Sequence, residues 1–91
     1  MRRTAPVLLR STTDDAAKWW EVEAAGRGID GLGGWRWRSR ISTFHPRKGT
    51  RVTVGPWIDL PSEPTDEKLR ELRDESVASF LSDPLAPWER A

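Results

Sequence analysis

The sequence contains no cysteine, no tyrosine, a single methionine and a single histidine. The absence of cysteine excludes disulfides and thiolate metal sites, and it favours a reducing compartment. Long apolar runs are also missing. Near the N-terminus the apolar run of residues 7–9 is too short for a signal-peptide core or a membrane span. We therefore expect a soluble, cytoplasmic protein with no membrane partner.

The sequence also contains no recognisable set of catalytic residues. The only histidine, His45, stands before Pro46 in a predicted turn, and no nucleophile-elbow motif accompanies it. The glycine-rich stretch over residues 26–34 lacks the Gly-Lys-Ser/Thr of a phosphate-binding loop, so we interpret it as a flexible connection. We expect no catalytic residue, no metal, no cofactor and no small-molecule substrate. The chain is predicted to be a non-enzymatic binding module.

What the sequence does contain is tryptophan and locally concentrated charge. Its 91 residues are enough for one domain with a thin core, and six tryptophans suit that need because each ring buries roughly 200 Å². Net charge is only +1, yet residues 35–51 carry six cations and no acid. Residues 52–91 carry nine acids and four cations. These blocks predict one basic surface and one acidic surface.

Alternation of apolar and polar residues is clearest over residues 35–43 and predicts a strand. Its two faces carry Trp35, Trp37 and Ile41 on one side and Arg36, Arg38 and Arg40 on the other. We call these three arginines the arginine ladder. A turn around Pro46 and Gly49 leads to a second strand over residues 51–54, which completes a hairpin with a basic tip.

On that second strand, Val52 and Val54 are predicted to face the core. Arg51 and Thr53 would then face outward and broaden the ladder, while Arg47 and Lys48 extend it at the tip. Pro56 breaks the pattern, so residues 57–60 form either a continuation after a bulge or an edge segment.

Residues 13–26 fit two secondary structures. As a helix, the segment begins at Thr13 and ends at Gly26. As a strand over residues 18–24, it alternates around Glu21 and Glu23, and its aromatic and β-branched residues favour this interpretation. The strand would place both glutamates beside the arginine ladder. The helix would leave the ladder without neutralising partners.

The C-terminal third predicts an amphipathic helix. Thr65 is a suitable N-cap, Asp66 and Glu67 follow in the first turn, and Pro84 stops the pattern. The predicted fold class is therefore α+β, a three-stranded antiparallel sheet covered on one face by this helix. We expect a flexible basic arm over residues 1–12, a β-β-β-α domain over residues 13–83 and a tail over residues 84–91.

The arginine ladder suggests a nucleic-acid surface. Side chains on one strand face recur about every 6.6–7 Å, which is close to the phosphate spacing along one strand of nucleic acid. The predicted duplex-DNA-binding residues are Arg36, Arg38, Arg40, Arg47, Lys48, Arg51 and Thr53, with possible arm contacts from Arg2, Arg3 and Arg10.

Two alternatives remain open at this level. Glu21, Glu23 or the acidic helix residues could pair with the ladder and neutralise it within the fold. The chain could also be a protein-interaction module, such as a small regulator or a phage-encoded inhibitor, that binds an acidic partner protein. Trp57 and Trp88 are the candidate protein contacts, because tryptophan and arginine are enriched at interface hot spots.

The order of motifs resembles the three-stranded, AP2-like arm-type DNA-binding domain of tyrosine integrases. The places that match are Gly34, Trp35, Arg36, Arg38, Lys48, Gly49 and Thr65, within residues 20–82. The resemblance implies that the sheet enters the major groove, with Arg36, Arg38, Arg40 and Arg51 facing DNA. Two features depart from the family pattern: Gly55-Pro56 interrupts the third strand, and the helix begins Thr-Asp-Glu instead of Thr-Lys.

Overall fold

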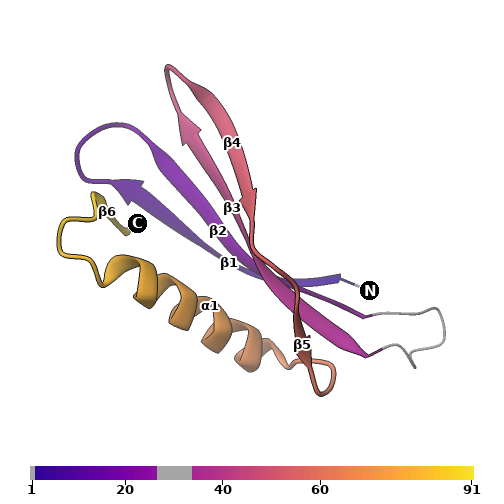
Figure 1. Ribbon diagram of the computed structural model, residues 1–91. Coiled ribbons are helices and arrows are strands. Elements are labelled where there is room, and N and C mark those ends of the chain that lie inside the picture. Colours follow the sequence, from indigo (N-terminus) through magenta and orange to yellow (C-terminus); the bar gives the residue numbers. More distant parts are fainter. Residues whose placement is uncertain (1, 27–33) are drawn as a thin grey trace.

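The computed structural model describes residues 2–26 and 34–91. Its elements in chain order are β1 (Arg2–Ser11), β2 (Ala17–Gly26), β3 (Trp35–His45), β4 (Gly49–Val54), β5 (Ile58–Leu60), α1 (Asp66–Leu81) and β6 (Trp88–Arg90). The strands form one antiparallel sheet in the order β4-β3-β2-β1-β6, and β5 pairs with the start of β3 (Figure 1). The α+β class with an antiparallel sheet and one helix is confirmed, but the sheet has six strands and not three.

Two of the three extra strands come from the two ends of the chain, and the third is β5, within the segment after Pro56 for which the sequence left two interpretations open. The prediction of a flexible arm over residues 1–12 is wrong, because β1 pairs along its length with β2. The tail expected over residues 84–91 contains β6, which pairs with the end of β1. Neither end of the chain shows a strong alternating pattern. The strands there form because they pair with neighbouring strands, and local sequence contributes little.

The ambiguous segment is a strand. β2 spans the predicted residues 18–24, and β1 and β3 flank it on its two sides. Trp20, Val22 and Ala24 alternate toward α1 and are buried, as the period of two requires. Most of the glycine-rich stretch lies outside the described residues.

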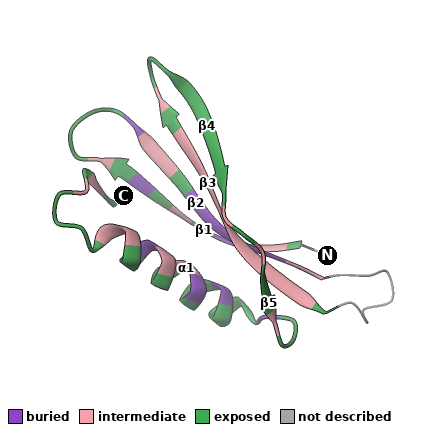
Figure 2. Cartoon of the chain, viewed as in Figure 1, coloured by how far each residue is buried: buried purple, intermediate pink, exposed green. Residues whose placement is uncertain are grey.

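α1 covers one face of β1 and β2, which we call the covered face of the sheet (Figures 1 and 2). The Thr65 side chain accepts a hydrogen bond from the Lys68 N–H at 3.0 Å, so the predicted N-cap is confirmed. The core of helix and sheet has two clusters: Ala5, Val22, Ala24, Leu69 and Leu72 form one, and Leu9, Trp20 and Val77 form the other. Among the described residues no helix covers the opposite side of the sheet, which we call the open face.

The β3–β4 hairpin depends on one glycine. The Lys48 N–H donates to the His45 carbonyl at 3.2 Å, and Gly49 then adopts a φ of 82°. This is the pattern of a three-residue loop followed by a left-handed residue, a conformation that a side chain disfavours. The turn fixes the register in which Arg51 lies opposite Thr43.

Candidate nucleic-acid interface

The arginine ladder lies on the open face, as the alternation predicts. Strand register places Arg40 opposite Glu21 and Arg38 opposite Glu23 on β2. The Arg38 Nε donates to Glu23 Oε1 at 2.5 Å, and the Arg40 Nη1 lies 3.4 Å from Glu21 Oε1. The alternative in which the two glutamates neutralise the ladder is therefore the one that the structure adopts.

Arg2 completes this network from the other side of β2. Its Nε donates to Glu23 Oε2 at 2.7 Å and its Nη2 donates to Glu21 Oε1 at 3.0 Å. Glu23 is only 4% exposed. Burial would raise the pKa of its carboxyl, but hydrogen bonds from Arg38 and Arg2 outweigh burial and hold that pKa below its ordinary value. The Glu23 carboxylate thus stays charged, and both glutamates belong to one network of ion pairs with Arg2, Arg38 and Arg40.

Trp57 covers the rest of the ladder. Its ring lies 4.4 Å from the Arg36 guanidinium carbon and 4.3 Å from that of Arg38. Such stacking is attractive because the ring face is electronegative. The Arg36 Nε is buried and has no hydrogen-bond partner among the described residues. Trp57, which stays a predicted protein contact, packs on the arginine ladder.

The other predicted arm contacts are paired as well. Arg3 bonds to Asp66 and to the Pro64 carbonyl at the start of α1. Arg10 donates to Glu89 of β6 at 2.7 Å. The Arg3 side chain thus links β1 to the start of α1, and the Arg10 side chain links β1 to β6. Neither arginine is an unpaired surface cation.

The structure separates the second set of predicted contacts from the ladder. Val54 lies opposite Arg40, and directly opposed residues share a face, so Val52 and Val54 lie on the open face. Arg51 and Thr53 therefore lie on the covered face. The prediction that they broaden the ladder is wrong: one step of register, set by the turn at Gly49, reverses both faces of β4.

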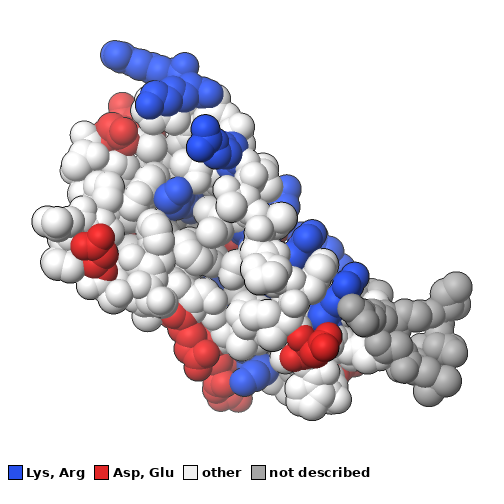
Figure 3. Space-filling model, in the orientation of Figure 1, with Lys and Arg blue, Asp and Glu red and all other residues white. Residues whose placement is uncertain are grey.

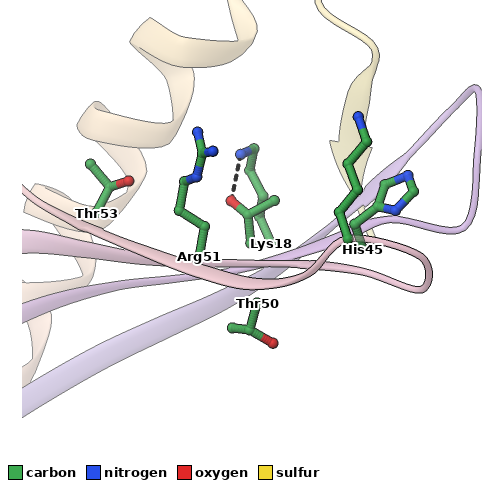
Figure 4. A pocket seen from close by; sticks show the side chains of 7 residues that line it. Lys18, His45, Thr50, Arg51 and Thr53 are labelled. Carbon is green, nitrogen blue, oxygen red and sulfur yellow. Dashed lines mark hydrogen bonds between the residues drawn. The ribbon is translucent and has the colours of Figure 1, made fainter.

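Beyond the end of α1, the covered face holds a hollow of about 650 Å³. Its lining contains cations, hydroxyls and one imidazole, with no carboxylate: Lys18, Thr43, His45, Lys48, Thr50, Arg51 and Thr53. We call it the basic hollow. Figure 4 shows Lys18, Arg51 and His45 projecting to one side of the hairpin, whereas Thr50 points to the other.

Lys18 is the residue that sequence reasoning missed. It continues the covered-face alternation of Trp20 and Val22 past the end of the apolar core. Its Nζ donates to Thr43 Oγ1 at 2.7 Å and lies 4.6 Å from the Trp88 ring. Burial lowers the pKa of Lys18, since no carboxylate among the described residues compensates for the lost hydration. Extending the alternation of Val22 and Trp20 by two more residues toward the N-terminus would have predicted that Lys18 lies on the covered face.

His45 and Arg47 occupy the tip of the hairpin. The His45 Nδ1 accepts a hydrogen bond from the Arg47 N–H at 3.1 Å, and its Nε2 lies 3.5 Å from Asp14 Oδ2. The exposed Arg47 side chain borders a smaller hollow that Asp14 and Asp15 also line. In Figure 3, Lys and Arg atoms gather at the hairpin end, while many of the acidic atoms lie along the helix.

Exposed apolar side chains were also not anticipated. Leu8, Trp19, Phe44, Val52 and Val54, each between 44% and 50% exposed, lie together on the hairpin half of the open face. Trp88, a candidate protein contact, is half-buried and packs on the second core cluster. The signal for Trp19 was its position next to the inward-facing Trp20, since neighbours on a strand face opposite ways.

Comparison with known proteins adds no further constraint. No protein-family model matches the chain, and neither the curated proteins nor the solved structures contain a significant match. Within residues 2–26 and 34–91, no three His, Asp or Glu side chains gather in a way that could hold a metal ion. No helix in the same ranges has the length and apolar character needed to cross a bilayer.

Proposed function

We propose that the protein is a non-enzymatic module that binds duplex DNA through the basic hollow and the tip of the β3–β4 hairpin. The observation that carries this proposal is the group of cations there without a carboxylate partner among the described residues: Lys18, Arg47, Lys48 and Arg51. Four cations held close together repel one another, and a polyanion relieves that repulsion. The arginine ladder does not need a polyanion to relieve its repulsion, because Glu23 and Glu21 already pair with Arg38 and Arg40.

The chemistry of the basic hollow suits phosphate. Lysine, arginine and threonine side chains supply most phosphate contacts in protein–DNA complexes, and Thr43 and Thr53 stand beside Lys18 and Arg51. A two-stranded ribbon is also narrow enough to enter a major groove. The resemblance to integrase arm-type domains placed the ladder against DNA. We propose instead that the hairpin makes the contact and that the ladder supports the sheet.

The test is a salt titration of fluorescently labelled random duplex DNA with three proteins. The wild type is compared with Lys48→Gln/Arg51→Gln and with Lys68→Gln/Arg70→Gln, which removes the same two charges from exposed positions on α1. Each neutralised phosphate contributes about 0.9 to the slope of log affinity against log salt. We expect the hairpin variant to lose about 1.8 from that slope and roughly 10- to 100-fold in affinity. The helix variant should match the wild type.

Two results would overturn this proposal. One is the absence of any binding at low salt. The other is an equal loss in both variants, which would indicate a net-charge effect without a site.

A second candidate is an acidic protein that binds the same cations. Exposed Phe44, Val52 and Val54 lie on the other face of the same hairpin, and apolar side chains of this kind are typical of protein contacts. A pull-down from nuclease-treated lysate distinguishes the two. A protein retained by the wild type and the helix variant, but lost with the hairpin variant, supports this candidate.

A further inference from the structure

β4 is an exposed edge of the sheet. It pairs with β3 on one side, and Figure 1 shows no element along its other side. All six of its residues are exposed, and four of them are the β-branched Thr50, Val52, Thr53 and Val54. Native proteins usually protect such an edge with a bulge, a proline or several charges, and β4 carries Arg51 as its one charge.

The unpaired backbone groups of β4 belong to one set of residues. Gly55 donates its N–H to the Ser39 carbonyl at 2.9 Å, so the alternation of an antiparallel ladder directs residues 51 and 53 toward β3 as well. The amides and carbonyls of Thr50, Val52 and Val54 then point away from the sheet. The side chains of these same residues lie on the open face.

We propose that β4 pairs antiparallel with β4 of a second copy of this chain, with Val52 opposite Val52 of the second copy. In this register Thr50 lies opposite Val54, and Arg51 lies opposite Thr53. Apolar side chains on the open face then continue from one copy to the next, and the outward backbone groups of both strands are satisfied. The two sheets become one.

The charges of β4 favour this register. Arg51 is the strand's one charge, and pairing about Val52 sets it against a threonine of the other copy and not against the other Arg51. Shifting the register to centre on Arg51 would place two arginines directly opposite each other, which is destabilising. The charge of β4 therefore favours the register centred on Val52 over the register centred on Arg51.

This pairing goes beyond the proposed DNA binding and does not depend on it. It does bring the two basic hollows to the same side of a joined sheet, with Lys48 and Arg51 of both copies along it. Salt screens repulsion between these cations, so association of the free protein should strengthen as salt rises. DNA binding should weaken over the same range, so either proposal can fail alone.

The experiment is sedimentation equilibrium of the free protein over a range of concentrations, with substitutions at Val52 and Thr50. Both residues are exposed and lie opposite uncharged residues of β3, so both tolerate a lysine without loss of the fold. Val52→Lys sets two lysines of the dimer against each other and should weaken association roughly tenfold or more. Thr50→Lys is the matched control, because its lysine faces Val54 of the second copy, and we expect it to dimerise nearly as the wild type does.

A charge swap tests the register directly. Val52→Lys and Val52→Glu should each be monomers alone, and an equimolar mixture should form a one-to-one dimer. A wild type that stays monomeric at every concentration overturns the proposal. So does equal weakening by Val52→Lys and Thr50→Lys, or a mixture that stays monomeric.

Discussion

The arginine ladder and the hairpin cations, which are Arg47, Lys48 and Arg51, come from one continuous basic stretch of sequence, yet their surroundings in the fold are opposite. Two buried glutamates of β2 pair with Arg38 and Arg40, and the ring of Trp57 stacks on Arg36 and Arg38. The hairpin cations extend past the end of α1 and meet no carboxylate within ion-pairing distance among the described residues. A run of like charges in sequence is thus not a surface of like charge, because each strand's register decides its neighbours.

This difference predicts which region stabilises the protein and which is free to bind. Charges that hold one another in a partly buried network stabilise the fold and contribute little to a ligand. Cations that are close together and uncompensated contribute little to the fold and retain their attraction for an anion. Substitutions on the two sides of this division should therefore differ in effect, from the largest at Glu23 to the smallest at Arg40.

Glu23→Gln should have the largest effect. It removes a buried charge that two arginines bond, and hydrogen bonds to charged groups are worth about 1.5–3 kcal/mol each. Arg2 is more than half exposed and can regain water, so we expect a loss of about 2–3 kcal/mol in the free energy of unfolding. Urea unfolding measures it.

Lys48→Gln is the matched comparison, because Lys48 is exposed and has no ion pair among the described residues. Its effect on unfolding should stay within about 0.5 kcal/mol. Equal losses in the two variants would show that the regions do not differ in their structural role.

Acid should weaken the ladder side of the molecule first. The folded-state pKa of Glu23 lies below its ordinary 4.5, so folding contributes stability above pH 4.5 that is lost as the pH falls through the folded value. A hydrogen bond from the Ala16 N–H lowers the pKa of Asp14, and one from the Arg73 side chain lowers the pKa of Asp74, so both add to the same trend. Unfolding free energies measured from neutral to acid pH should fall less steeply for Glu23→Gln than for the wild type. An identical pH dependence would mean that Glu23 is not held charged by its arginines.

Gly49→Ala should damage the hairpin and leave the ladder intact. A φ of 82° disfavours any residue with a Cβ by about 1 kcal/mol, although the space around Gly49 is open. The same substitution at Gly55 serves as a control, because its added Cβ would make ordinary contacts of 3.8 Å with Ser39. We expect Gly49→Ala to lower both the melting temperature and DNA affinity. A variant with normal stability and binding would show that the tip does not need this turn.

Sequence reasoning found the helix, its Thr65 cap, the β3–β4 hairpin and the possible pairing of Glu21 and Glu23 with the ladder. These features follow from local alternation and capping, which sequence displays directly. It missed β1 and β6, because a strand at a chain end is stabilised by its neighbours more than by its own pattern. It also reversed the faces of β4 and assigned Arg51 to the ladder, since the turn before Gly49 sets a pairing register that alternation alone does not reveal.

The smallest expected effect is the sharpest test of where the two regions divide. Arg40 lies between them: its Nη1 is 3.4 Å from Glu21, its side chain is 37% exposed, and it faces Val54 of the hairpin. Replacing one exposed arginine that contacts phosphate costs about 0.9 in salt slope, so Arg51→Gln should weaken DNA binding measurably. Arg40→Gln should change affinity by less than about twofold and leave the slope unchanged. If Arg40→Gln weakens DNA binding as much as Arg51→Gln does, then DNA lies on the open face and the ladder is available to it despite its glutamates.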